Sequence, residues 1–237
     1  MAIVTLDPTS KDTTHPGLAL RQIRNERGWT LTEVSRRTGL SISTLSKIEN
    51  HKLSLSYDKL ARLCEGLEVD IARFFGNTPT SDDDVVVAGP TSGRRSLALS
   101  GDGDVIDTEH YRYLYPASDV LNKRFIPVII DVHERSRADF GKLTGHPGEE
   151  YVYVLEGCVE VHSDLYTPTL LRTGDSLYFD SGMGHAFVAV GDGPCRLLSI
   201  CSGGETAGAR GRATASPDVR SDAIALIPGA RRSAGGS

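Results

Sequence analysis

The sequence predicts a two-domain α+β protein, in which an all-α domain precedes an all-β domain. Apolar residues recur at helical spacing from residue 17 to residue 76. Residues 94–203 instead contain many short runs of alternating apolar and polar residues, separated by glycines. Residues 77–93 are rich in Asp, Thr, Ser, Pro and Gly, so we expect a linker between the two domains.

The composition excludes several classes of protein. The chain has 237 residues, of which 39% are hydrophobic and 24% charged, a balance typical of folded globular domains. It has no continuous apolar run of the roughly 18 residues that a membrane-spanning helix needs, so no membrane partner is expected. Its four cysteines include no Cys-x-x-Cys pair, which indicates reduced thiols in a cytoplasmic protein.

The formal net charge of −5 is unevenly distributed along the chain. Residues 16–76 contain ten Lys/Arg and seven Asp/Glu, a net charge of +3. Residues 119–200 contain seven Lys/Arg and twelve Asp/Glu, a net charge of −5. A mildly basic domain joined to an acidic one is consistent with a DNA-binding head on a sensor body.

We expect about five helices in residues 17–76, after a loose arm formed by residues 1–16. A capping box is predicted at Thr30 and Glu33: the Thr30 side chain accepts from the backbone of the first turn, and Glu33 reaches back to the cap. Three further N-caps are predicted, at Ser41, Ser56 and Asp70.

Two of the expected helices are separated by a turn at Gly39, which is the helix-turn-helix arrangement. Leu45 and Ile48 supply the inner face of the second helix, whose exposed side carries short polar residues and Lys47. The segment Leu20–Asn50 closely resembles the phage-repressor-like (Xre-type) helix-turn-helix family.

That resemblance implies that the second helix enters the major groove of double-stranded DNA. It also implies an ion pair between Arg24 and Glu49 that locks the first helix to this recognition helix. The residues matched to DNA contacts are Ser41, Ile42, Ser43, Thr44, Lys47 and Asn50. His51 stands where glycine is common, and histidine tolerates a positive φ better than most residues. A helical interaction module with a merely solvated polar face is the alternative.

The second half of the chain is predicted to form a sandwich or barrel of short strands. The expected strands are Phe125–Val132, Glu150–Glu156, Cys158–His162, Ser176–Asp180, His185–Val190 and Cys195–Cys201. Residues 204–237 lack aromatic residues and consist mostly of Gly, Ala, Ser and Arg, so we expect a disordered tail.

Two segments of this half resemble the two motifs of the cupin family. The first runs from Gly145 through His146 and Glu150 to Gly157, and the second from Gly174 to His185. The resemblance implies a cupin barrel (double-stranded β-helix) over residues 94–203.

In cupins these motifs supply metal ligands, and three of the usual four are present: His146, Glu150 and His185. Thr144 stands in place of the first histidine. Two imidazoles and a carboxylate suit one divalent transition metal, Fe, Zn, Mn or Ni. The alternative is a metal-free site whose polar side chains bind one another or an organic ligand. Residues expected to line the ligand pocket are Thr144, Phe187 and Ala189, whereas Tyr151 and Tyr153 are expected outside the barrel.

Together the two resemblances imply a bacterial transcription regulator that is not an enzyme. It is expected to be a homodimer that binds double-stranded DNA and a small-molecule effector. The same domain order occurs in the hydroxypropylphosphonate epoxidase family of non-haem iron enzymes, which the chain resembles over Pro127–Val132 and around its two histidines. Against an epoxidase, Gly28 stands where that family has a lysine. An interaction module without either ligand is a third alternative.

Overall fold

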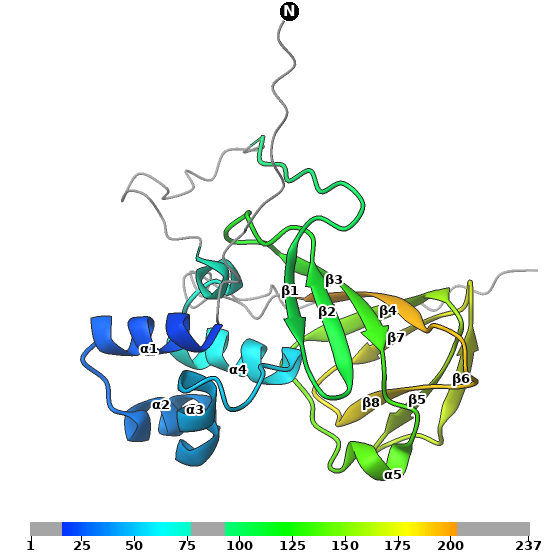
Figure 1. Ribbon diagram of the computed structural model, residues 1–237, viewed down its shortest axis with the longest axis horizontal. Helices are drawn as coiled ribbons and strands as arrows, with labels where there is room; N and C mark the ends of the chain where they lie inside the picture. Colours follow the sequence, from blue (N-terminus) through cyan, green and yellow to red (C-terminus); the bar gives the residue numbers. More distant parts are fainter. Residues whose placement is uncertain (1–15, 77–92, 203–237) are drawn as a thin grey trace, which may run out of the picture. The chain divides into compact units, whose positions relative to one another are not determined.

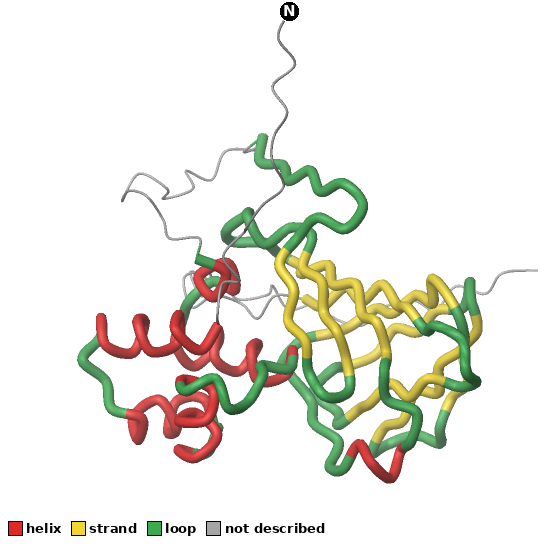
Figure 2. The backbone as a smooth tube through the Cα atoms, in the orientation of Figure 1, coloured by secondary structure: helices red, strands yellow, loops and turns green. Residues whose placement is uncertain are grey.

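The computed structural model describes residues 16–76 and 93–202. Nearly all of the expected arm and linker, and the whole expected tail, lie outside the described residues. The helices precede the strands, except for one short helix inserted among the strands (Figures 1 and 2). Within the described ranges no helix is both long and apolar enough to cross a membrane.

The helical part has the five elements expected, four α-helices and a 3-10 helix. They are α1 (Pro16–Glu26), α2 (Leu31–Thr38), α3 (Ile42–Glu49), α4 (Tyr57–Leu67) and η1 (Ile71–Phe75). Each helix turns its apolar face inward, with Leu20, Val34 and Leu45 fully buried. The helix-turn-helix pair is α2 and α3, and Gly39 ends α2 in the left-handed conformation that glycine adopts without strain.

Three of the predicted N-caps are confirmed. The side chains of Thr30, Ser41 and Asp70 each accept a hydrogen bond from a backbone N–H two or three residues further on. Each bond satisfies one of the backbone donors that the first turn of a helix leaves without a partner.

Two details of the predicted capping are wrong. The Glu33 carboxylate does not return to the N-cap but binds the guanidinium groups of Arg36 and Arg37, because charge-assisted bonds to two cations are stronger. Ser56 precedes α4 without capping it through its side chain, since its hydroxyl donates to the Asp58 carboxylate instead.

The β part contains two antiparallel sheets. Its elements are β1 (Asp104–Asp107), β2 (Tyr111–Tyr115), β3 (Phe125–Val132), α5 (Arg137–Phe140), β4 (Glu149–Glu156), β5 (Cys158–Ser163), β6 (Thr169–Arg172), β7 (Ser176–Asp180), β8 (His185–Ala189) and β9 (Arg196–Ser202). The larger sheet has the order β1-β2-β3-β9-β4-β7, and the smaller has the order β6-β5-β8. Alternate residues are buried in β4, where Val152 and Val154 are inside and Tyr151 and Tyr153 are half-buried, whereas β8 is buried throughout.

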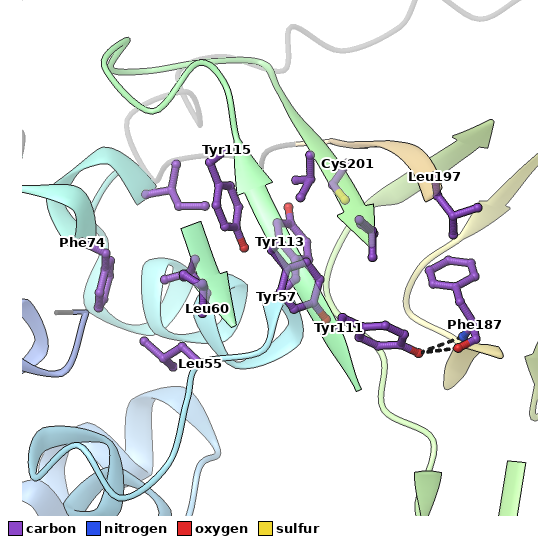
Figure 3. Packing of buried hydrophobic residues seen from close by; sticks show 14 of the residues in the cluster. Leu55, Tyr57, Leu60, Phe74, Tyr111, Tyr113, Tyr115, Phe187, Leu197 and Cys201 are labelled. Atoms are coloured by element: carbon purple, nitrogen blue, oxygen red, sulfur yellow. Dashed lines mark hydrogen bonds between the residues drawn. The ribbon is translucent and has the colours of Figure 1, made fainter. Parts of the chain in front are cut away.

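The side chain of Tyr111 joins the two sheets. Its hydroxyl accepts from the backbone N–H of Phe187 at 2.9 Å and donates to the Phe187 carbonyl at 3.0 Å (Figure 3). Both hydrogen-bonding groups at the middle of β8 are thereby bound to β2, which belongs to the other sheet. These two bonds tie β8, the strand that begins at His185, to the larger sheet.

Candidate DNA-binding helix and barrel site

One side of α3, together with its N-cap Ser41, presents a polar surface to solvent. Ser41, Ser43 and Lys47 are exposed, and Ile42 is 46% exposed. Thr44 is half-buried, and its hydroxyl lies 2.9 Å from that of Ser41. Short hydroxyls, an aliphatic side chain and a lysine are groups that read base edges in the major groove.

Arg24 and Glu49 form the expected ion pair between α1 and α3. Arg24 donates Nε to Glu49 Oε1 at 2.7 Å and Nη2 to Oε2 at 3.0 Å. Glu49 is only 4% exposed, so its charge depends on this partner. The hydrogen bond to Glu49 raises the pKa of Arg24 above its ordinary value.

Asn50, the last of the residues matched to DNA contacts, is exposed but bound within the helical part. Its amide donates to the Ser46 carbonyl at 2.8 Å and accepts from Arg21 at 2.9 Å. Its side chain is therefore held in a fixed orientation at the end of α3.

The turn after α3 has the Schellman pattern of two reverse hydrogen bonds. The N–H of Lys52 donates to the Lys47 carbonyl at 2.7 Å, and that of His51 to the Ile48 carbonyl at 3.1 Å. His51 adopts φ 57°, the left-handed conformation expected for it. Lys52 is thus fixed to the last turn of the recognition helix.

In the barrel the three predicted ligands lie together. His146 precedes β4, Glu150 is in β4, and His185 begins β8. The Nε2 atoms of the two histidines lie 3.0 and 3.4 Å from Oε2 of Glu150. All three side chains are buried.

The contacts of Glu150 and His185 shift the pKa of each group. Burial alone would raise the pKa of Glu150, but the hydrogen bonds and charges of His146 and His185 lower it to about 2. Burial alone would lower the pKa of His185, yet the Glu150 carboxylate and the Met183 carbonyl raise it. His185 Nδ1 lies 3.0 Å from that carbonyl, which leaves Nε2 facing the carboxylate.

Two further residues belong to this site, and sequence reasoning missed both. Ser199 donates its hydroxyl to Glu150 Oε1 at 2.6 Å, and the Cys201 sulfur lies 3.3 Å from Ser199 Oγ. The ligand atoms of His146, Glu150 and Cys201 all lie within 4.8 Å of one another. Cys201 stands directly opposite Glu150 in the pairing of β9 with β4, a register that no local motif specifies.

A cavity of about 400 Å³ opens beside the triad. Thr144 and Phe187 line it as expected, whereas Ala189 lies outside its lining, four residues along β8 from His185. Tyr57 of α4 also lines the cavity, and its ring meets the His146 ring edge to face at 4.7 Å. Two imidazoles, a carboxylate and an aromatic wall can hold a metal or a small organic ligand.

Comparison with known proteins supports both halves of this description. Residues 20–74 match the helix-turn-helix family, and residues 136–201 match the cupin domain family. The chain joins an Xre-type helix-turn-helix domain to a C-terminal cupin domain.

Relatives of this helix-turn-helix and cupin protein include both regulators and an enzyme. It is 24% identical over 186 residues to the HTH-type transcriptional regulator PuuR of Escherichia coli, covering 78% of this chain and 92% of PuuR. It is 33% identical over 128 residues to the (S)-2-hydroxypropylphosphonic acid epoxidase of Streptomyces wedmorensis, covering 50% of this chain and 60% of that enzyme.

Among solved structures, an HTH_3 family transcriptional regulator from Vibrio cholerae shares its fold. The TM-score is 0.51 at 22% sequence identity, over 80% of this chain and 96% of the regulator.

Proposed function

We propose that this protein is a cytoplasmic, homodimeric transcription regulator that binds double-stranded DNA through α3 and a small-molecule effector in its barrel. One observation carries the DNA-binding role. Glu49 at the inner side of α3 is held by a buried ion pair, while Ser43 and Lys47 on its outer side are exposed. A short helix fixed in this way can lie in the major groove without losing its own packing.

We infer the homodimer from the small DNA-contacting surface of one α3 helix. One eight-residue helix contacts only a few base pairs, and proteins of this class gain affinity and specificity by presenting two such helices to paired half-sites. We therefore expect the preferred DNA to be a palindrome with its half-sites about one helical turn apart.

For the barrel we propose a sensing site built on His146, Glu150 and His185. These three donors fit one divalent transition metal (Fe, Zn, Mn or Ni), because the Nε2 atoms of both histidines face the same carboxylate oxygen. Such an ion, when bound, would act as a Lewis acid that accepts an anionic or chelating effector. Without metal, the same imidazoles would bind the effector through hydrogen bonds.

Selection of bound fragments from random duplex DNA tests the proposal. The full chain should enrich a palindromic sequence. Ser43→Glu, which puts a negative charge on the exposed face of α3, should abolish the enrichment. Ser100→Glu, the same change at an exposed turn of the barrel part, should leave it intact. Failure to enrich any sequence would contradict DNA-specific regulation.

The second candidate function is a mononuclear non-haem iron oxygenase or epoxidase. The observation that favours it is the set of two histidines and one carboxylate, together with the sequence similarity to the epoxidase. Oxygen uptake by iron-loaded protein with (S)-2-hydroxypropylphosphonic acid, lost in His146→Ala, would establish this function. We expect no uptake above the level of that variant.

A further inference from the structure

The cavity beside the triad is formed by two parts of the chain that are far apart in sequence. One wall comes from residues 52–59, which lead from the recognition helix α3 into α4, and the other walls come from the barrel. The aromatic rings of Tyr57, Tyr111 and Tyr113 lie close together along this junction (Figure 3). A ligand that fills the cavity therefore touches the helical part and the barrel at once.

Charges without partners are unevenly distributed around this cavity. Lys52 and Lys142 line it, are exposed, and form no ion pair within the described part of the chain. Glu109 is the one lining carboxylate that likewise forms none among residues 16–76 and 93–202. The remaining lysine, carboxylate and histidine side chains that line the cavity are each paired: Lys59 lies 3.9 Å from Asp58, His110 lies 2.7 Å from Glu134, and Glu150 is bound by the two histidines.

From this surplus of positive charge we propose that the cavity binds a small organic anion, a molecule with a carboxylate-type group at Lys52 and Lys142 and an apolar body against the tyrosines. This inference rests on the proposed sensing role of the barrel and names the chemical class of its ligand. Lysine ammonium groups make charge-assisted hydrogen bonds to such an anion, and the aromatic wall excludes water from its apolar part. The volume of about 400 Å³ accommodates a molecule of this size.

The position of Lys52 gives the ligand a direct connection to DNA binding. Its backbone N–H closes the Schellman turn on the carbonyl of Lys47, a residue of the proposed DNA-contacting face. At the other end of the same loop, Tyr57 contacts His146. A ligand held by Lys52 and the barrel fixes this loop from both ends, and so favours one orientation of the recognition helix.

The proposal is tested with matched probes on the full chain: benzoate, benzamide and benzylamine, which share a ring and differ in charge. By titration calorimetry benzoate should bind saturably and more tightly than either of the others. Lys52→Met and Lys142→Met should each weaken benzoate binding about tenfold, the loss of one charge-assisted hydrogen bond. Glu109→Gln should strengthen it, and Arg124→Met, an exposed cation outside the cavity, should not change it.

Amide hydrogen exchange with benzoate reports where the probe binds. Protection of residues 50–60 together with residues 144–150 is expected for a ligand that spans both walls. Equal binding of all three probes, no saturable benzoate binding, or unchanged affinity in both lysine variants would overturn the proposal. These outcomes are independent of the DNA selection described above, which tests the regulatory function with no ligand present.

Discussion

The ring of Tyr57 meets the ring of His146 edge to face, with the two centroids 4.7 Å apart. Tyr57 is the first residue of α4, and it lines the cavity beside the triad together with Tyr113 and Cys201. Further along α4, Arg62 donates to the carbonyl of Gly145 at 3.0 Å. The helix that follows the recognition helix is thus bound to the segment that carries the first cupin motif.

Loss of the Tyr57 side chain should destabilise the protein strongly. Because this ring is only 7% exposed, Tyr57→Ala should lower the free energy of unfolding by about 3–5 kcal/mol, whereas Tyr57→Phe, which keeps the ring and removes only the hydroxyl, should lower it by about 1 kcal/mol. Urea unfolding measures both. Tyr166→Ala, at a site 70% exposed, is the control and should have little effect. A Tyr57→Ala loss as small as that of the control would show that the ring is not buried in solution.

Removal of Glu49 should unfold the helical part. Glu49→Ala leaves Arg24 without its partner at a nearly buried position, a change that costs about 3–5 kcal/mol. The pair of Glu33 with Arg36 and Arg37 is solvent-exposed and offers the control, because Glu33→Ala should leave unfolding almost unchanged. Circular dichroism at the helical band during heating separates the two variants. Equal melting temperatures of the Glu49→Ala and Glu33→Ala variants would show that the Glu49 carboxylate is exposed to solvent.

Most of the fold could be predicted from the sequence because its determinants are local. Gly39, with Ser41 two residues later, specifies the turn and the start of α3 by backbone conformation and capping alone. The spacing of His146 and Glu150 within one motif likewise puts both side chains at the same end of β4. Such signals depend on residues a few positions apart.

The missed residues depend on contacts between distant segments. Cys201 joins the triad through the register of β9 against β4, and Tyr57 joins it through the packing of a helix against the barrel. No motif of neighbouring residues in the sequence indicates either contact. The side chain of Glu33 was also predicted wrongly, since two arginines on its own helix compete with the cap for its carboxylate.

The stability that the triad contributes to the metal-free protein should decrease both at low pH and at high pH. The folded pKa of Glu150 is lowered to about 2, so its contribution is complete above the unfolded pKa of about 4.3 and is lost as the pH falls toward 2. The pKa of His185 is raised, so its contribution is complete below about pH 6.5 and is lost as the pH rises through the folded pKa.

The difference in unfolding free energy between the unsubstituted protein and Glu150→Gln should therefore be largest between about pH 4.5 and 6.5. Unfolding by urea across the pH range, in the presence of a chelator, measures this difference. Glu109→Gln removes an exposed carboxylate and should give a small difference with no maximum. A flat profile for Glu150→Gln would mean that the carboxylate and the histidines do not interact.

Metal binding should depend on both histidines. Cobalt(II) added to the chelator-treated protein should give a visible absorption spectrum that His146→Ala with His185→Ala abolishes, while His133→Ala, at an exposed site, preserves it. An additional intense band in the near ultraviolet, lost in Cys201→Ser, would identify the sulfur as a further ligand, since the Cys201 sulfur lies within 4.8 Å of the ligand atoms of His146 and Glu150. An unchanged cobalt spectrum in the double histidine variant would exclude the triad as the metal site.

Lys47 should contribute to DNA binding through a base or through a phosphate, and the two contacts have different consequences. If its ammonium group binds a base edge, Lys47→Ala should weaken binding to the selected sequence by about 1–3 kcal/mol and relax the preference at that position. If it binds phosphate, affinity should fall equally for all sequences. The slope of the logarithm of affinity against the logarithm of salt concentration should then become shallower by about one. Fluorescence anisotropy with selected and scrambled duplexes over a range of salt concentrations distinguishes these results.

Arg124→Met is the control for a general loss of positive charge, because Arg124 is an exposed cation just before β3, outside the helix-turn-helix. Equal effects of the two substitutions would show that the exposed face of α3 does not contact DNA.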